Sequence, residues 1–173
     1  MSNYKTLLAD IKTFIFDVDG VMTDGIVLLT TQGDMLRTMN VKDGYALQLA
    51  VKKGYRIIII SGGNSEAVRE RFKGLGIKEI HLAIGNKLEV FHKIVEEDNL
   101  DLKTILYMGD DIPDYEIMRE VGVAACPADA AEEIKHISKY ISPVAGGRGC
   151  ARDVIEQVMK VQQTWFDEDG FHW

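Results

Sequence analysis

Cysteine is scarce in this sequence. The 173 residues contain only Cys126 and Cys150, which lie far apart and form no Cys-x-x-Cys pair. Neither a disulfide framework nor a zinc site of clustered thiolates is therefore indicated. Isolated cysteines of this kind are typical of small buried residues in a reducing compartment, so we expect a cytoplasmic protein.

Long apolar runs and basic clusters are also missing. No apolar stretch reaches the roughly 18 residues of a membrane span, and the first residues lack the apolar segment of a signal peptide. The formal net charge is -7, so neither nucleic acid nor an anionic membrane is expected as a partner. An anionic substrate would need lysine or arginine side chains placed locally at its site.

Short apolar runs alternate with amphipathic segments along the chain. The patterns predict strands over residues 13–16, 56–60, 79–82, 104–108 and 123–125, and helices over 45–53, 66–75, 88–99, 115–121 and 130–137. Apolar strands separated by helices form a parallel sheet that is covered on both faces. We therefore predict a single α/β domain over residues 1–173, with a doubly wound, Rossmann-like sheet.

Two segments depart from this alternation. Residues 26–39 consist of two apolar runs around a polar turn with Gly33, which predicts a β-hairpin projecting beside the end of the first strand. Residues 142–149 form a glycine-rich loop, and a final helix is expected over 151–165.

The richest motif is Asp17-Val18-Asp19-Gly20-Val21, which directly follows the first apolar strand. Ligands of doubly wound sheets bind beyond the carboxyl ends of the strands. A chain that turns at a strand end can place Asp17 forward and Asp19 beside it, which suits a nucleophile next to an acid/base. A simple turn or a calcium loop would explain the same motif about equally well.

Two further strand ends carry groups that suit a phosphate. Ser61-Gly62-Gly63 offers a hydroxyl and free backbone N–H groups, although glycines also end many strands for purely structural reasons. Lys87 begins the next predicted helix, where solvation is the ordinary role of a lysine. Beside two carboxylates, however, a bound phosphoryl group would need a fixed cation.

The strand over 104–108 ends in three carboxylates, those of Asp110, Asp111 and Asp114. Acids crowded at a dry strand end repel one another unless a cation compensates their charge. A hard, oxygen-ligated ion such as Mg²⁺ resolves that conflict. Capping of the following helix is the alternative role, which we assign to Asp111 or Asp114 and not to Asp110.

Taken together and in this order, the four motifs resemble those of the haloacid dehalogenase superfamily. The resemblance implies that Asp17 attacks phosphorus and that Asp19 protonates the leaving alcohol and then activates water. It also implies that Ser61 and Lys87 bind the phosphoryl group. Mg²⁺ would be held by the Asp17 carboxylate, the Asp19 carbonyl and Asp110, with Asp111 or Asp114 in an outer position. The short intervals between the motifs leave no room for a cap domain.

Three flanking segments narrow the resemblance. Residues 17–25, 41–45 and 145–153 look like those of the 3-deoxy-D-manno-octulosonate 8-phosphate (KDO 8-phosphate) phosphatases. These are Mg²⁺-dependent homotetramers of lipopolysaccharide synthesis, in which a hairpin builds the oligomer and the glycine-rich tail closes a neighbouring active site. The resemblance makes an anionic sugar phosphate the expected substrate, and the candidate residues for binding it are Thr23, Lys42, Gly62, Arg71 and Arg148.

One departure and three alternatives stay open. Many relatives carry arginine at the position of Gly63, so a basic contact expected there is absent. A phosphatase for nine-carbon, sialic-type sugar 9-phosphates is the rival in the same class, and Arg148 favours the eight-carbon acid. A non-catalytic regulatory or oligomerisation domain would be expected to lack Asp17, Asp19 or Asp110. A phosphoprotein phosphatase would be favoured by a monomeric state.

Overall fold

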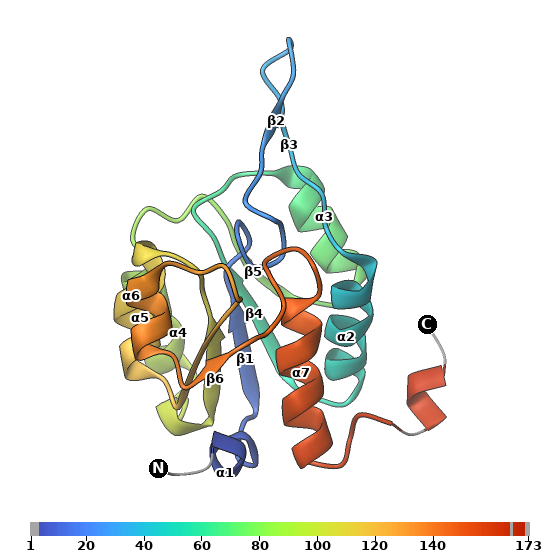
Figure 1. Ribbon diagram of the computed structural model, residues 1–173, viewed down its shortest axis with the longest axis vertical. Coiled ribbons are helices and arrows are strands. Elements are labelled where there is room, and N and C mark those ends of the chain that lie inside the picture. Colours follow the sequence, from blue (N-terminus) through green and yellow to red (C-terminus); the bar gives the residue numbers. More distant parts are fainter. Residues whose placement is uncertain (1–3, 167, 172–173) are drawn as a thin grey trace.

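The fold is built on a sheet of six parallel strands (Figure 1). The structure is a computed structural model that describes residues 4–166 and 168–171. In spatial order the strands are β5 (Glu79–His81), β4 (Arg56–Ile60), β1 (Thr13–Phe16), β6 (Ile105–Met108), β7 (Val123–Cys126) and β8 (Tyr140–Ile141). The four residues of β1 pair with β4 on one side and β6 on the other, and all four are buried.

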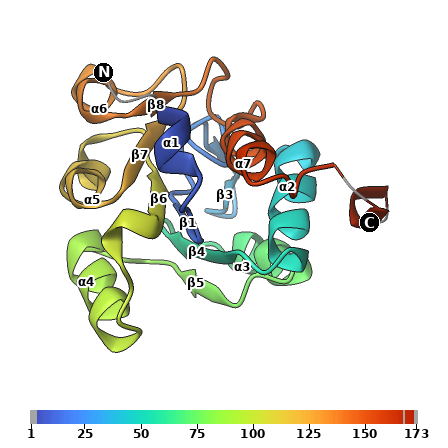
Figure 2. The ribbon, with the colours of Figure 1, turned by 90° about the horizontal axis from the view of Figure 1, so that it is seen from below.

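Helices cover both faces of this sheet (Figure 2). One face carries α2 (Val41–Lys52), α3 (Glu66–Gly74) and α7 (Cys150–Val161), and the other carries α4 (Lys87–Glu97), α5 (Tyr115–Glu120) and α6 (Glu132–Ile137). Successive side chains of a strand point to opposite faces. Phe14 and Phe16 accordingly pack into one core and Ile15 into the other. The predicted doubly wound α/β fold is confirmed.

Several predicted boundaries were wrong. Helix α2 begins at Val41 and not at residue 45, because the Asn40 side chain accepts a hydrogen bond from the Lys42 backbone N–H and caps the helix. Helix α7 ends at Val161 and not at residue 165, just before Gln163 takes a positive φ of 59°. The sequence also gave no signal for the two-residue strand β8 or for the short helix α1 (Tyr4–Leu8).

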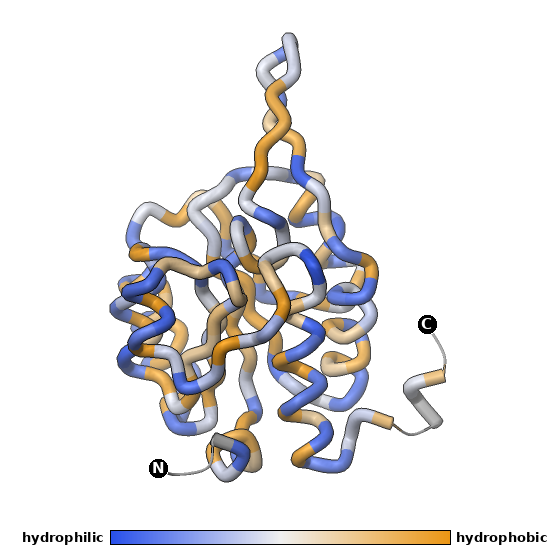
Figure 3. The backbone as a smooth tube through the Cα atoms, in the orientation of Figure 1, coloured by the Kyte–Doolittle hydropathy of each residue, from blue (hydrophilic) through white to orange (hydrophobic). Residues whose placement is uncertain are grey.

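The predicted hairpin is present but its paired part is short. Strands β2 (Leu28–Leu29) and β3 (Met35–Leu36) pair over only two residues each, and they stand clear of the domain (Figures 1 and 3). Their four apolar side chains and that of Ile26 are 50–71% exposed. An apolar surface that projects in this way is typical of a contact with another protein chain.

The connections around the sheet's carboxyl edge are otherwise compact. Between β1 and α4 the chain inserts the hairpin and no cap domain, so the edge of the sheet is left open to solvent.

Within the residues that the structure describes, we find no helix with the length and apolar character needed to span a membrane.

Candidate active site

The predicted catalytic side chains converge at the carboxyl edge of the sheet. Asp17 and Asp19 follow β1, Ser61 follows β4, Lys87 begins α4, and Asp110 follows β6. All five line one open cavity of about 620 Å³. Its wall also includes Gly62, Asp111 and Asp114. The parallel sheet therefore brings together four motifs that are spread over nearly one hundred residues.

Lys87 is the central cation of the cavity. Its Nζ atom lies 2.9 Å from Asp17 Oδ1 and 2.8 Å from Asp114 Oδ1, and its side chain is only 8% exposed. Asp114 is almost fully buried and also accepts hydrogen bonds from the Tyr107 hydroxyl (2.6 Å) and the Asp110 backbone N–H (3.2 Å). Asp114 is thus an anchor for Lys87. The sequence had predicted only an outer position for Asp114.

The acids of the site outnumber the cation between them. Burial, together with the Asp114 charge, raises the pKa of Asp17 to about 6 even though Lys87 acts in the opposite sense. Burial and the charges of Asp17 and Asp114 raise the pKa of Asp110 to about 7. Burial by itself lowers the pKa of Lys87, but the two neighbouring carboxylates outweigh it and raise that pKa. A further cation would relieve this repulsion.

The carboxylates fit a metal ion. Asp17, Asp110 and Asp114 each offer an oxygen, and these atoms lie within 4.8 Å of one another. Both Asp114 oxygens already accept hydrogen bonds, whereas the Asp110 carboxylate lies directly against the Gly20 backbone. Gly20 has a φ of +86°, and a Cβ atom there would collide with the Asp110 carboxylate, so only glycine suits this position. Oxygen donors of this kind are those that Mg²⁺ prefers.

Ser61 and Gly62 directly follow β4 at the same edge of the sheet. Ser61 is 2% exposed, and its Oγ atom accepts a hydrogen bond of 3.2 Å from the Gly63 backbone N–H. Both Ser61 and Gly62 line the cavity, so their positions agree with the predicted binding of a phosphoryl group.

Asp19 has a partner that sequence reasoning missed. The guanidinium of Arg37 donates to both of its carboxylate oxygens, from Nε at 2.6 Å and from Nη2 at 2.9 Å. Arg37 is the only basic residue of the hairpin segment 26–39, and this was the one signal that could have drawn attention to it. Thr23, expected to bind substrate, is completely buried, and its hydroxyl donates to Asp19 Oδ1 at 3.5 Å.

The remaining predicted binding residues do not line the cavity. Lys42 is exposed at the start of α2, and Arg71 lies over Gly44 beside a smaller cavity behind the hairpin. Arg148 is 69% exposed, with its Nη2 atom 3.4 Å from Asp24 Oδ2. Asp111 accepts a hydrogen bond from the Ile112 backbone N–H and caps the short 3₁₀ helix that follows it, as predicted for one of the two outer acids.

The glycine-rich loop packs against the nucleophile loop of its own chain. The Gly147 backbone N–H donates to the Val21 carbonyl at 2.9 Å, and a side chain at Gly146 would collide with the Gly20 carbonyl. The buried Asp43 of α2 accepts a hydrogen bond of 2.7 Å from the Arg152 backbone N–H and so holds the start of α7. These contacts fix the loop backbone and leave the Arg148 side chain facing outward.

Comparison with known proteins agrees with this geometry. Residues 79–152 match the family model described as haloacid dehalogenase-like hydrolase. The chain is 32% identical over 157 residues to 3-deoxy-D-manno-octulosonate 8-phosphate phosphatase KdsC of Salmonella typhi. The aligned region covers 91% of this chain and 84% of the relative. This chain belongs to the haloacid dehalogenase-like hydrolases, in the phosphatase family of that relative.

Solved structures of this phosphatase family share the fold closely. The KDO 8-phosphate phosphatase of Moraxella catarrhalis, in complex with a magnesium ion, a phosphate ion and a KDO molecule, is 32% identical with a TM-score of 0.90 and covers 94% of each chain. The cobalt-bound enzyme of Haemophilus influenzae is 26% identical with a TM-score of 0.88, covering 95% of this chain and 98% of its own. Relatives therefore hold divalent metals, and this phosphatase has an acidic cluster that could hold one.

The raised pKa values predict that Mg²⁺ stabilises the protein in a pH-dependent way. Between about pH 4 and pH 7 the folded, metal-free site retains protons on Asp17 and Asp110 that the unfolded chain has lost. The free energy of unfolding of the metal-free protein should therefore fall as the pH rises through this window. Mg²⁺ requires the ionised carboxylates, so the melting temperature should rise little on adding Mg²⁺ at pH 5 and clearly at pH 8.

Calorimetry with and without Mg²⁺ at matched ionic strength would check this. Asp43, whose pKa burial also raises to about 6, lies outside the acidic cluster and affects both series alike. Asp110→Asn should abolish most of the difference that Mg²⁺ makes. An equal Mg²⁺ effect at both pH values would contradict the assignment of these carboxylates as metal ligands.

Proposed function

We propose that this phosphatase hydrolyses KDO 8-phosphate to KDO and phosphate, as a step of lipopolysaccharide synthesis. One observation carries the proposal: the Moraxella relative that binds Mg²⁺, phosphate and KDO matches this chain over nearly its whole length. The arrangement of Asp17, Asp19, Lys87 and Asp110 around one cavity supplies the groups that such a reaction needs. We place the enzyme in the cytoplasm, in keeping with the free, buried thiols of Cys126 and Cys150.

The first step transfers the phosphoryl group to the enzyme. An Asp17 carboxylate oxygen bonds to phosphorus while the bond from phosphorus to the sugar oxygen breaks. Asp19 gives its proton to that departing oxygen, so the sugar leaves as an alcohol. Lys87 Nζ and the groups at Ser61 and Gly62 hold the negative phosphoryl oxygens.

The second step returns the enzyme to its starting state. Asp19, now ionised, takes a proton from a water molecule whose oxygen bonds to phosphorus as the bond to Asp17 breaks. Inorganic phosphate is released and Asp19 again carries a proton. A Mg²⁺ ion held by Asp17, Asp110 and the Asp19 carbonyl would neutralise charge on the phosphoryl group in both steps.

We further propose that the enzyme works as a homotetramer. The exposed apolar hairpin supports this, because its side chains have little to pack against in their own chain. In such an assembly the glycine-rich tail would bring Arg148, which is exposed and does not line the cavity of its own chain, to the sugar acid at a neighbouring site. Light scattering of Leu29→Asp should give smaller species than wild type, with Thr31→Asp at the hairpin turn as the control. A wild-type mass near one chain would refute the tetramer.

The substrate assignment is tested by Mg²⁺-dependent phosphate release. We expect kcat/KM for KDO 8-phosphate to exceed those for a nine-carbon sugar acid 9-phosphate and for a hexose phosphate by at least about tenfold, a difference of about 1.4 kcal/mol in transition-state binding. Equal or reversed preference would retain the aspartate chemistry and favour the nine-carbon or a broader class. An absence of turnover on all three would favour a protein substrate or a non-catalytic role.

A further inference from the structure

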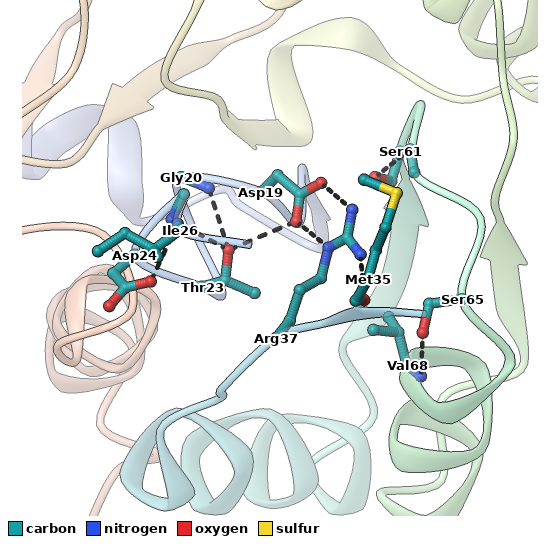
Figure 4. A network of polar contacts seen from close by, with 12 residues as sticks. Asp19, Gly20, Thr23, Asp24, Ile26, Met35, Arg37, Ser61, Ser65 and Val68 are labelled. Atoms are coloured by element: carbon teal, nitrogen blue, oxygen red, sulfur yellow. Dashed lines mark hydrogen bonds and ion pairs between the residues drawn. The ribbon is translucent and has the colours of Figure 1, made fainter. Parts of the chain in front are cut away.

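Arg37 connects the hairpin to the reacting groups. It directly follows β3 (Met35–Leu36), and Figure 4 shows its guanidinium reaching from the hairpin strand to Asp19. Its Nε and Nη2 atoms bind the two Asp19 oxygens at 2.6 and 2.9 Å, while Nη1 donates to the Met35 carbonyl at 3.0 Å. The side chain is only 8% exposed although it belongs to a projecting hairpin.

Arg37 binds Asp19 from outside the active-site cavity. Asp19 lines the active-site cavity and Arg37 does not. Arg37 instead lies beside Gly63, where a Cβ atom would come within 3.4 Å of Nη2 and within 3.2 Å of Asp19 Oδ2. Gly63 therefore leaves the space that the ion pair fills. On the other side Asp19 Oδ1 accepts the hydrogen bond from Thr23 (Figure 4).

We infer that Arg37 is a positioning residue that fixes the Asp19 carboxylate in the direction of the leaving group. A guanidinium that binds both oxygens of a carboxylate restrains the plane of that carboxylate as well as its distance. Displacement of a proton donor by even about 1 Å can cost a hundredfold in rate. The inference rests on the proposed function, in which Asp19 protonates the departing oxygen; for that step one Asp19 oxygen exchanges its hydrogen bond from Arg37 for a proton, while the other oxygen keeps its bond to the guanidinium.

Because Arg37 belongs to the hairpin, its ion pair with Asp19 couples the hairpin to the catalytic loop. β2 and β3 share only two residue pairs, and the further hydrogen bonds between Thr30 and Asp34 lie at the turn of the hairpin, away from Arg37. The ion pair with Asp19 ties the end of the hairpin to the catalytic loop. A change in the position of the hairpin should therefore move Arg37, and with it the Asp19 carboxylate, and so alter the rate of proton transfer.

The test compares substrates that differ in their need for a proton. p-Nitrophenyl phosphate releases a stable phenolate and needs little protonation, whereas ethyl phosphate and KDO 8-phosphate release alcohols that need it. Arg37→Gln should lower kcat/KM for both alkyl esters by about 10- to 100-fold and for the aryl ester by less than about threefold. Arg37→Lys should recover part of the loss. Arg119→Gln, which removes an arginine that lies over the Tyr115 ring and does not line the active-site cavity, is the matched control.

A double substitution gives an independent readout. In an Asp19→Asn background, Arg37→Gln should add less than about a threefold further loss, because the side chain that it positions has already lost its function. Full additivity would overturn the inference, as would an equal loss on all three substrates.

A loss confined to KDO 8-phosphate would overturn it in favour of direct contact with the sugar acid. Failure of the proposed substrate is a separate result, because the comparison of ethyl and p-nitrophenyl phosphate does not depend on it. Should Arg37→Gln fail to fold, Arg37→Lys still decides the question through the ratio of the two simple esters.

Discussion

Asp17→Asn should lower kcat by at least about a thousandfold, an increase of about 4 kcal/mol in the activation barrier. The amide keeps the shape of the carboxylate but cannot form the covalent bond to phosphorus. Phosphate release from KDO 8-phosphate and from p-nitrophenyl phosphate would measure the loss. Both substrates should be affected equally, because the nucleophile is needed whatever group departs.

The same substitution should not harm the fold. Burial raises the pKa of Asp17 to about 6, so the folded site resists the negative charge of this side chain at neutral pH. Removing that charge should leave the melting temperature of the metal-free protein at pH 7.5 unchanged or higher. Loss of activity with a preserved melting temperature separates a chemical role from a structural one.

The covalent intermediate can be examined directly. Acid quenching during turnover of a ³²P-labelled substrate should leave label on the wild-type chain that hydroxylamine removes, as expected for an acyl phosphate. Asp17→Asn should carry none. Asp19→Asn should accumulate label from p-nitrophenyl phosphate, because the second step lacks its base. Label on Asp17→Asn, or residual activity above a few per cent, would move the nucleophile elsewhere.

The convergence of the catalytic residues at one edge of the sheet could be predicted from the geometry of parallel strands. Carboxyl ends of parallel strands share an edge, so residues directly after β1, β4 and β6 had to meet there. Asp17, Ser61 and Asp110 needed only correct strand assignments. The continuous apolar runs of these strands made the assignments secure, whereas β8, with two residues, offered no pattern.

Contacts between side chains from different elements were beyond the same reasoning. Arg37 is separated from Asp19 by a hairpin whose tilt relative to the sheet no periodicity specifies. Asp114 was expected to be an outer acid or a cap, yet the turn after β6 folds it inward until it is 1% exposed. Its partner Tyr107 looked like any other apolar residue of a strand, because its hydroxyl only becomes meaningful once Asp114 is placed beside it.

Lys87→Met should damage both catalysis and stability. The substitution removes the cation that lies between Asp17 and Asp114 at 2.9 and 2.8 Å and leaves two buried carboxylates uncompensated. Breaking a buried ion pair from one side commonly costs about 3–5 kcal/mol of stability. Loss of the charge that faces the phosphoryl oxygens should also lower kcat/KM by at least about a hundredfold. Urea denaturation at pH 7.5 without Mg²⁺ and phosphate-release kinetics with Mg²⁺ would measure the two effects.

The pH dependence tells this electrostatic role apart from simple packing. Without Lys87 the pKa values of Asp17 and Asp110 should rise further above those of the unfolded chain, so the folded site gains protons more readily as the pH falls. The destabilisation of Lys87→Met should therefore be large at pH 7.5 and small near pH 5. Lys87→Arg, which keeps the charge in a bulkier side chain, should lose activity but show no such pH dependence. A loss of stability that is the same at both pH values would mean that Lys87 supports the fold through its aliphatic chain, and that the acids of the site tolerate one another without it.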